Sequence, residues 1–157
     1  MQYSLMTELG LRPCSRFLAD RLFYLAMLST LPVLSVMGLL VPGRGRRLDL
    51  PVSVLFFYLL WQPLLEELLF RGVVQGQLRR MAWARKMFFG LSLANLVTSL
   101  LFVLTHLASQ PVLWALSVFF PSLVFGFFRD RHAQIYPGLI LHSTYNGFFL
   151  LTVAWLR

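Results

Sequence analysis

The sequence predicts an all-α protein, a polytopic bundle of transmembrane helices, from three observations. Hydrophobic residues make up 58% of the chain and charged residues only 13%, and the mean hydropathy of +0.71 is well above that of a water-soluble domain of 157 residues. Long apolar runs alternate with short segments that contain proline, glycine or arginine. Backbone that crosses lipid must satisfy its own hydrogen bonds, so we expect these runs to be helices.

About five runs are long enough to cross a membrane. They follow an interfacial segment, residues 1–21, in which Glu8, Arg12, Arg16 and Asp20 are interleaved with apolar residues. This pattern fits either a short amphipathic helix on the membrane surface or a frayed leader. Residues 22–157 then form one transmembrane domain without internal repeats. The expected spans are 22–41, 50–78, 87–107, 112–128 and 135–156.

Turn residues and basic residues set the limits of each span. The first contains no charge, is long for a signal peptide and lacks a small-x-small cleavage site, so we expect it to be retained. A turn-rich loop over 42–51 leads into the second span, which ends before Arg79 and Arg80. The third ends in an uncharged connection over 108–111, and the segment 129–131 closes the fourth before the fifth begins.

The net charge of +8 comes from 14 basic residues, of which Lys86 is the only lysine, against 6 acidic ones. Because these residues lie between apolar runs, we expect contacts with anionic membrane lipid and not with nucleic acid. With the N-terminus inside, nine basic residues lie on the inner side and four on the outer side, which favours this orientation. Cys14 is the single cysteine, which excludes an internal disulfide and a cysteine-based metal cluster.

Residues 61–72 place three ionisable side chains, Glu66, Glu67 and Arg71, inside the second apolar run. Such groups each cost about 2.5–3.5 kcal/mol at the bilayer centre and are rare there without a partner and a role. Glu67 and Arg71 are four residues apart and are expected to pair, which leaves Glu66 available. Pro63 removes a backbone donor and is expected to bend the helix, and Gln75 and Gln77 extend the polar path.

Three further polar residues lie within other spans: His106 in the third, and His142 and Asn146 in the fifth, where their spacing allows them to pair. At 1.5 Å per residue, Glu66, His142 and Asn146 lie at similar depths, roughly 16–22 Å from the basic ends of their helices. His106 is deeper by about two turns, which requires helix tilt or a third helix that starts late. The four side chains can then meet inside the bilayer.

These residue types suit hydrolysis of an amide by an activated water. A desolvated carboxylate beside a histidine can act as general base, and polar groups on a facing helix can donate to the oxyanion. A serine or cysteine mechanism has less support, because Ser143 adjoins His142 in sequence and Cys14 lies outside the core.

The motifs Glu66-Glu67-x-x-x-Arg71, Phe102-x-x-x-His106 and His142-x-x-x-Asn146, in this order, resemble those of the CAAX protease and bacteriocin-processing family (CPBP, Abi-like) of glutamic-type intramembrane endopeptidases. The resemblance covers about residues 50–151. It implies that Glu66 and His106 activate water and that His142 and Asn146 form the oxyanion site. Glu67, Arg71 and Phe102 would be supporting residues.

The short chain resembles the small bacterial members of that family, which implies a multi-pass protein of the bacterial cytoplasmic (inner) membrane. The implied substrate is a membrane-anchored protein or peptide, with a C-terminal sorting or anchor segment as one form. No cofactor is expected. Zinc is the alternative, but no His-Glu-x-x-His motif occurs.

Simpler interpretations remain for each residue. Glu67 and Arg71 would form a structural ion pair, His106 would bond a backbone carbonyl, and His142 and Asn146 would only hold helices together. Gly72 and Gly76 would let helices approach, and His132 would be a solvated loop residue. The alternative function is then a non-catalytic membrane protein, such as a bacteriocin-immunity factor or a small proton-linked carrier.

Overall fold

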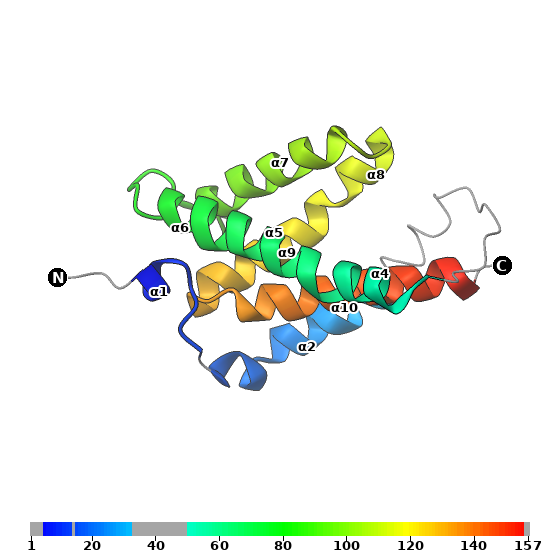
Figure 1. Ribbon diagram of the computed structural model, residues 1–157. Coiled ribbons are helices and arrows are strands. Elements are labelled where there is room, and N and C mark those ends of the chain that lie inside the picture. The colour runs from blue at the N-terminus through cyan, green and yellow to red at the C-terminus, as the bar shows by residue number, and fades with distance from the viewer. Residues whose placement is uncertain (1–4, 14, 33–49, 156–157) are drawn as a thin grey trace.

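The computed structural model describes residues 5–13, 15–32 and 50–155, and helices dominate it (Figure 1). The strands in these ranges form one hairpin of two short strands. The elements in chain order are α1 (Leu5–Glu8), η1 (Ser15–Ala19), α2 (Arg21–Leu28), α4 (Val52–Phe56), η2 (Phe57–Trp61), α5 (Gln62–Glu67), η3 (Leu68–Val74), α6 (Gln75–Leu78), β1 (Met87–Phe88), β2 (Leu91–Ser92), α7 (Leu93–Leu107), α8 (Val112–Ser117), α9 (Phe119–His132) and α10 (Tyr136–Trp155).

Two helical stretches have the length and hydropathy needed to cross a membrane within the described ranges. The elements from α4 to α6 form one stretch of 27 residues, Val52–Leu78, and α8 and α9 form another of 21 residues, Val112–His132. Only 11% and 33% of their most apolar windows are buried inside the protein. Their apolar side chains therefore face outward, as expected of helices solvated by lipid and not of a soluble core.

The third expected span is shorter than the sequence suggested. Residues 87–92 form an antiparallel hairpin in which Met87 pairs with Ser92, so the prediction of helix there is wrong. Phe89 and Gly90 both have positive φ, 49° and 80°, as in the two-residue turns that connect twisted strands. The helix α7 consequently begins at Leu93, and this late start leaves His106 roughly 20 Å along the helix, a depth similar to that of Glu66.

The other two expected spans are described to different extents. The first begins at Arg21, where the Asp20 side chain accepts a hydrogen bond from the Leu22 amide at 3.1 Å and so caps α2. Residues 33–41 of this span lie outside the described residues. The fifth expected span contains the helix α10, Tyr136–Trp155.

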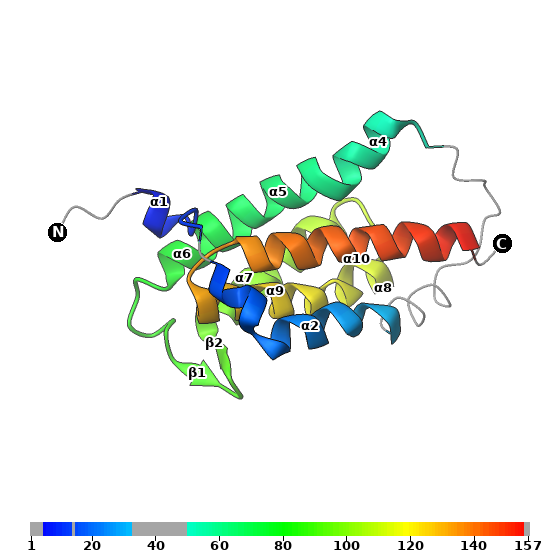
Figure 2. The same ribbon diagram turned by 90° about the horizontal axis from the view of Figure 1, so that it is seen from below.

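The helix α9 lies between α7 and α10, with α2 packed against α10 and the stretch from η2 to α6 lying across α10, α7 and α9 (Figures 1 and 2). An aromatic core joins these elements. Phe23 meets Phe128 edge to face at 5.8 Å, and Phe125 meets Tyr145 at 5.5 Å. Such contacts between aromatic rings fix the spacing of the helices that carry the polar residues.

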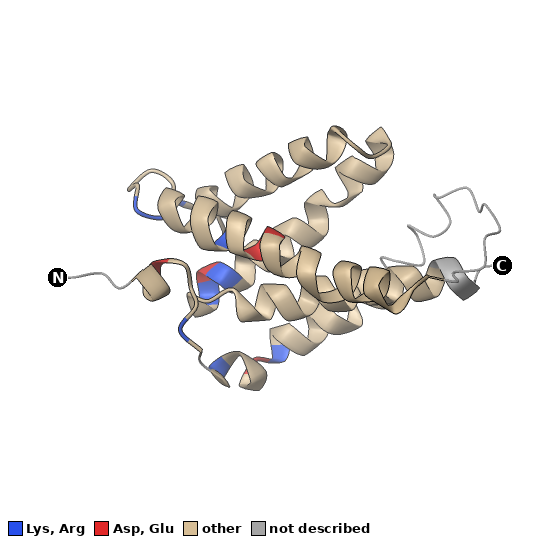
Figure 3. Cartoon of the chain, viewed as in Figure 1, with Lys and Arg blue, Asp and Glu red and all other residues tan. Residues whose placement is uncertain are grey.

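Charged residues gather at one end of the bundle (Figure 3). This end holds α1, α6, the hairpin and the start of α2. No charged residue of the described chain lies in α4, α8 or α10. The sequence predicted that basic residues cluster on one side of the membrane. In the structure, the basic residues that precede α2, those that follow α6 and those at the end of α9 do lie on one side. Arg44, Arg46, Arg47 and Arg157 lie outside the described residues.

The N-terminal segment contains two short helices, α1 and η1, and not one amphipathic helix. The backbone around α1 packs on glycines of the long helix: a Cβ on Gly72 would lie 3.2 Å from the Leu9 carbonyl oxygen, and one on Gly76 would lie 3.0 Å from that of Glu8. The buried Arg129 side chain donates to the carbonyl oxygens of Arg71 at 2.9 Å and Glu8 at 2.6 Å. The two glycines thus allow the N-terminal segment to approach closely.

Candidate active site

The helix that carries Glu66 and Glu67 contains two widened turns. The Gln62 amide donates to the Phe57 carbonyl, and the Gln75 amide donates to the Phe70 carbonyl, so both bonds span five residues instead of four. Widened turns of this kind occur frequently at functional sites. Here they lie on either side of α5, the short segment that presents both carboxylates.

Asn146 has a structural role, because it bonds to a backbone carbonyl that Pro63 leaves without a helical donor. The Gln62 amide is bonded to Phe57, and Pro63 has no N–H, so neither residue provides a helical donor for the Tyr58 carbonyl. The Asn146 side chain donates to that oxygen at 3.0 Å and ties α10 to η2. The spacing of His142 and Asn146 would allow them to pair, but no hydrogen bond between them is among the described contacts. Asn146 bonds instead to the Tyr58 carbonyl, five residues before Pro63.

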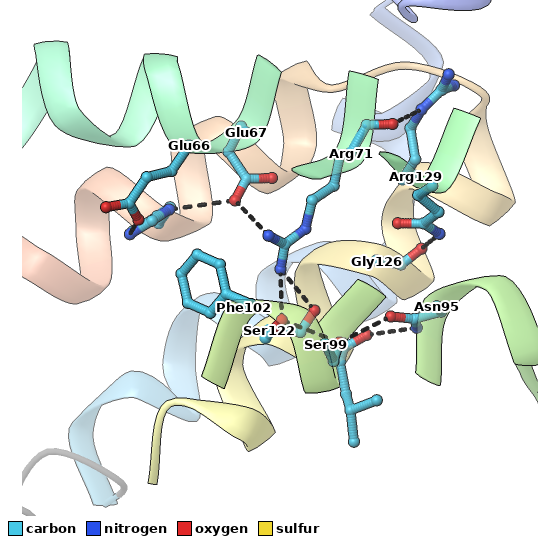
Figure 4. A network of polar contacts seen from close by, with 12 residues as sticks. Glu66, Glu67, Arg71, Asn95, Ser99, Phe102, Ser122, Gly126 and Arg129 are labelled. Atoms are coloured by element: carbon cyan, nitrogen blue, oxygen red, sulfur yellow. Dashed lines mark hydrogen bonds and ion pairs between the residues drawn. The ribbon is translucent and has the colours of Figure 1, made fainter. Parts of the chain in front are cut away.

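Glu67 and Arg71 form the expected ion pair, with Oε1 of Glu67 3.4 Å from Nη1 of Arg71. Both side chains are fully enclosed, at 0% and 1% exposure. The same Oε1 lies 3.1 Å from Nδ1 of His142. Gly138 makes room for this carboxylate, because a Cβ there would lie 2.6 Å from Oε2 of Glu67. The pair thus forms a buried support that contacts His142 through Glu67, and Figure 4 shows Glu67 beside Arg71.

Glu66 lies at the other side of His142. Its Oε1 accepts from Nε2 of Gln62 at 2.9 Å, and its Oε2 lies 3.6 Å from Nε2 of His142. This Oε2 atom is buried and has no hydrogen-bond partner in the structure, although the side chain as a whole is 20% exposed. Burial of a carboxylate oxygen without a hydrogen bond is costly, and Oε2 of Glu67 is in the same situation.

The His142 ring has a carboxylate oxygen facing each of its nitrogens. A neutral imidazole has only one N–H, so the ring can donate in both directions only as imidazolium. The ring is 8% exposed and stacks on Phe125 at 5.0 Å, so its orientation is fixed by packing as well as by charge.

His106 lies on the neighbouring helix α7 and contacts Phe102. Its Nδ1 lies 2.9 Å from the Phe102 carbonyl oxygen, and its ring lies 4.4 Å from the Phe102 ring. Because a carbonyl can only accept, Nδ1 carries the proton, and in the neutral ring Nε2 then has its lone pair available. No hydrogen bond joins His106 to Glu66 among the described contacts. Phe102 lies next to both histidine rings, 6.1 Å from that of His142.

The phenyl rings of Phe102 and Phe125 also enclose the guanidinium of Arg71, at 5.0 and 5.4 Å. Nη2 of Arg71 donates to the Ser122 carbonyl and hydroxyl at 2.9 and 2.8 Å. Contacts with aromatic faces and charge-assisted hydrogen bonds are two ways to hold an arginine in a poor solvent. Phe102 therefore contacts three of the polar side chains that the motifs predicted.

A chain of buried polar residues continues from Arg71 and was not predicted from the sequence (Figure 4). Ser122 donates to Ser99 at 2.9 Å, and Ser99 donates to Asn95 at 3.2 Å. Asn95 fits against Gly126, where a Cβ would lie 1.9 Å from its Oδ1. Small polar residues are common in any helix, so the only sequence signal for these positions is their spacing of three or four residues on apolar helices.

A second branch leads to the charged end of the bundle. The buried Gln75 donates to the Gly126 carbonyl and to Asp130, both at 2.9 Å, and Asp130 accepts from Ser92 at 2.5 Å. The predicted polar path therefore includes Gln75, whereas Gln77 is exposed.

His132, expected in a solvated loop, is instead the last residue of α9 and bonds to Asp20 at 2.9 Å.

The two carboxylates beside His142 do not converge on one point in the described structure. Glu66 and Glu67 face opposite nitrogens of one imidazole, so their oxygens point toward the ring from two sides and not toward a common centre. Within the described part of the chain, no three His, Cys, Asp or Glu side chains form a group that could hold a metal. A zinc site needs three or four such ligands around one point.

Comparison with known proteins gives one match. A protein-family model described as "Type II CAAX prenyl endopeptidase Rce1-like" matches residues 48–148, about two thirds of the chain. These residues include the polar side chains of the candidate active site, from Gln62 to Asn146. No curated protein and no solved structure is significantly similar to the chain. The family is a membrane-embedded protease family, and this chain belongs to the Rce1-like type II CAAX prenyl endopeptidase family.

Proposed function

We propose that this protein is a glutamic-type intramembrane endopeptidase in which Glu66 is the general base. The proposal depends chiefly on one observation: Oε2 of Glu66 lacks a hydrogen-bond partner, as does that of Glu67, but the Glu66 side chain is 20% exposed whereas that of Glu67 is fully enclosed. A water bound to Oε2 of Glu66 would be held where the carboxylate can take its proton. Nε2 of His106 is the second acceptor for this water.

In the proposed reaction, the water oxygen bonds to the carbonyl carbon of the substrate while Glu66 takes the proton. The oxyanion that forms receives hydrogen bonds from Nε2–H of His142 and from Asn146, whose amide nitrogen has a second hydrogen besides the one given to Tyr58. The C–N bond then breaks, and the amine leaves with the proton from Glu66. The products are a carboxylate and a free amine.

Glu67 and Arg71 are positioning residues in this scheme. Glu67 bonds to Nδ1 of His142 and so directs Nε2 toward Glu66, and Arg71 holds Glu67 in place. No metal takes part. The substrate is a membrane-anchored protein or peptide, because the site lies among helices whose outer faces are apolar.

The test is cleavage of membrane-anchored peptides by the full chain in lipid nanodiscs. Farnesylated peptides with a four-residue C-terminal tail are compared with the same peptides without the prenyl group, and products are identified by mass spectrometry. Glu66→Gln and His106→Ala should abolish cleavage. Glu8→Gln and His132→Ala remove the same groups away from the site and should cleave at normal rates. Cleavage by Glu66→Gln at the normal rate would exclude this mechanism.

Hydroxylamine distinguishes an activated water from a covalent nucleophile. An acyl-enzyme would be trapped and yield a peptide hydroxamate, whereas direct attack by water yields only the carboxylate. We expect no hydroxamate, and incorporation of one ¹⁸O atom from labelled water. A hydroxamate product would favour a serine or cysteine nucleophile.

A further inference from the structure

Two adjoining hollows lie between α2 and α9, away from the candidate active site. The first is a shallow, open pocket of about 520 Å³ lined by Arg16, Arg21 and Arg131 together with Asp20 and His132. The second is a groove of about 410 Å³ with an almost entirely apolar lining, including Ala26, Phe120, Val124 and Phe127. Leu22 lines both, so the basic pocket and the apolar groove are neighbours.

The basic pocket has an excess of positive charge. Asp20 is its single carboxylate, and Arg131 and His132 already bond to it at 2.5 and 2.9 Å. Arg16 and Arg21 are exposed and make no hydrogen bond or ion pair among the described residues. The pocket therefore presents two uncompensated guanidinium groups, which suit the oxygens of a phosphate.

The groove continues from the pocket along apolar residues of α9. From Phe128 to Phe120 it extends roughly 12 Å at 1.5 Å per residue. One leaflet of the hydrocarbon core is about 15 Å deep, half of the ~30 Å total. The elements that line the pocket, η1, the start of α2 and the end of α9, belong to the part of the fold where charged residues gather (Figure 3), and the groove lining continues along α9 to Phe120.

We propose that this composite site binds one anionic phospholipid, with its phosphate headgroup at Arg16 and Arg21 and an acyl chain in the groove. A headgroup at the membrane boundary and a chain that enters the hydrocarbon region match the order in which the basic and apolar linings occur. Such a lipid would fill the space between α2 and α9 and hold α2 against the bundle. This role is independent of the proposed peptidase reaction.

The test is native mass spectrometry of the full chain released from micelles that contain dioleoyl phosphatidylglycerol or dioleoyl phosphatidylcholine. We expect one tightly retained phosphatidylglycerol and weaker retention of phosphatidylcholine. The variant R16Q/R21Q should lower phosphatidylglycerol affinity by about fivefold for each arginine removed. The matched control R85Q/K86Q removes the same charge from exposed positions outside the pocket and should leave affinity unchanged.

A second pair of variants tests the groove. Ala26→Leu narrows it and should weaken retention of the lipid, whereas Ala108→Leu makes the same change at an exposed position outside it.

Equal binding of both lipids, or equal losses in R16Q/R21Q and R85Q/K86Q, would overturn the proposal in favour of non-specific adsorption. Binding of glycerol 3-phosphate as tight as that of the lipid, unaffected by Ala26→Leu, would identify a free phosphate site instead. Displacement of the lipid by a neutral farnesylated peptide, unaffected by R16Q/R21Q, would make the groove a substrate site and equally overturn it.

Discussion

The Nδ1 atom of His142 lies 3.1 Å from Oε1 of Glu67, and the two residues are 75 positions apart in the chain. This contact links α10 to α5 at the centre of the bundle. It occupies one nitrogen of the ring and leaves Nε2 facing Glu66. The contact thus distinguishes the two adjacent glutamates: Glu67 bonds to Nδ1 of the ring, and the more exposed Glu66 faces Nε2.

The first prediction concerns Gly138, which makes room for Glu67. In Gly138→Ala the new methyl group would lie 2.6 Å from Oε2 of Glu67, so the carboxylate must move and His142 with it. We expect peptide cleavage to fall by about 100-fold, the size of effect that a misplacement of about 1 Å causes. Gly147→Ala on the same helix is the control, because its Cβ would make an ordinary 3.5 Å contact. Equal activity of the two variants would contradict the prediction.

The second prediction concerns the buried ion pair. Arg71→Met leaves the Glu67 charge enclosed without its partner and should destabilise the protein by about 3–5 kcal/mol. The double variant Arg71→Met with Glu67→Gln removes both charges and should recover much of that loss. Thermal unfolding followed by circular dichroism measures both. If the double variant is no more stable than Arg71→Met alone, the pair does not carry compensating charges.

The third prediction separates the structural role of Asn146 from its catalytic role. Asn146→Ala leaves the Tyr58 carbonyl without a donor and should cost about 1 kcal/mol of stability. Pro63→Ala restores a backbone N–H in that turn, so the stability cost of Asn146→Ala should shrink in the Pro63→Ala background. The loss of cleavage should stay the same in both backgrounds if Asn146 also donates to the oxyanion. A loss of activity that Pro63→Ala repairs would leave Asn146 with the structural role only.

The fourth prediction concerns pH and Asp20, which lies outside the helices that cross the membrane. Burial raises the pKa of this carboxyl, but hydrogen bonds from Arg131, from the Leu22 amide and from His132 outweigh it, so the pKa lies below its usual 3.8. A lowered pKa in the folded state stabilises the protein above pH 3.8, and this contribution is lost as the pH falls below that value. Unfolding temperatures at pH 6 and pH 3 should therefore differ less in Asp20→Asn than in the wild type. An identical pH dependence would refute the assignment.

The fifth prediction is that cleavage does not need a metal ion. The carboxylates of Glu66 and Glu67 approach one imidazole from opposite sides, an arrangement without a common centre for zinc. Prolonged treatment with 1,10-phenanthroline and dialysis should leave peptide cleavage unchanged. The non-chelating isomer 1,7-phenanthroline is the control for direct inhibition. Loss of cleavage that zinc restores would contradict the prediction.

Charge placement within apolar runs was the informative part of the sequence. Glu66, Glu67, Arg71, His142 and Phe102 lie together in the structure, as the motifs suggested. Ionisable groups in a lipid-solvated helix are so costly that their presence alone indicates a common interior. The ion pair of Glu67 and Arg71 followed from helical periodicity, because residues four apart share one face.

The partners of each group could not be read from periodicity. Asn146 and His142 also share a face, yet Asn146 bonds to Tyr58 because Pro63 leaves that carbonyl without a donor. Likewise, the hairpin over 87–92 replaces the first turns of an expected helix, because a tight turn at Phe89 and Gly90 competes locally with helix. Such choices depend on which donors and acceptors remain after the helices pack.

The sequence by itself determined the class of protein, the helices that carry the polar residues and the identity of most of those residues, because hydropathy and helical spacing are properties of a single segment. The tertiary structure decided that Glu67 bonds to Nδ1 of His142 and that Glu66 faces Nε2. It also decided where the path through Ser122, Ser99 and Asn95 runs, and how α2 and α9 form a basic pocket beside an apolar groove. These features are contacts between segments distant in the chain, and they exist only once the helices are packed against one another.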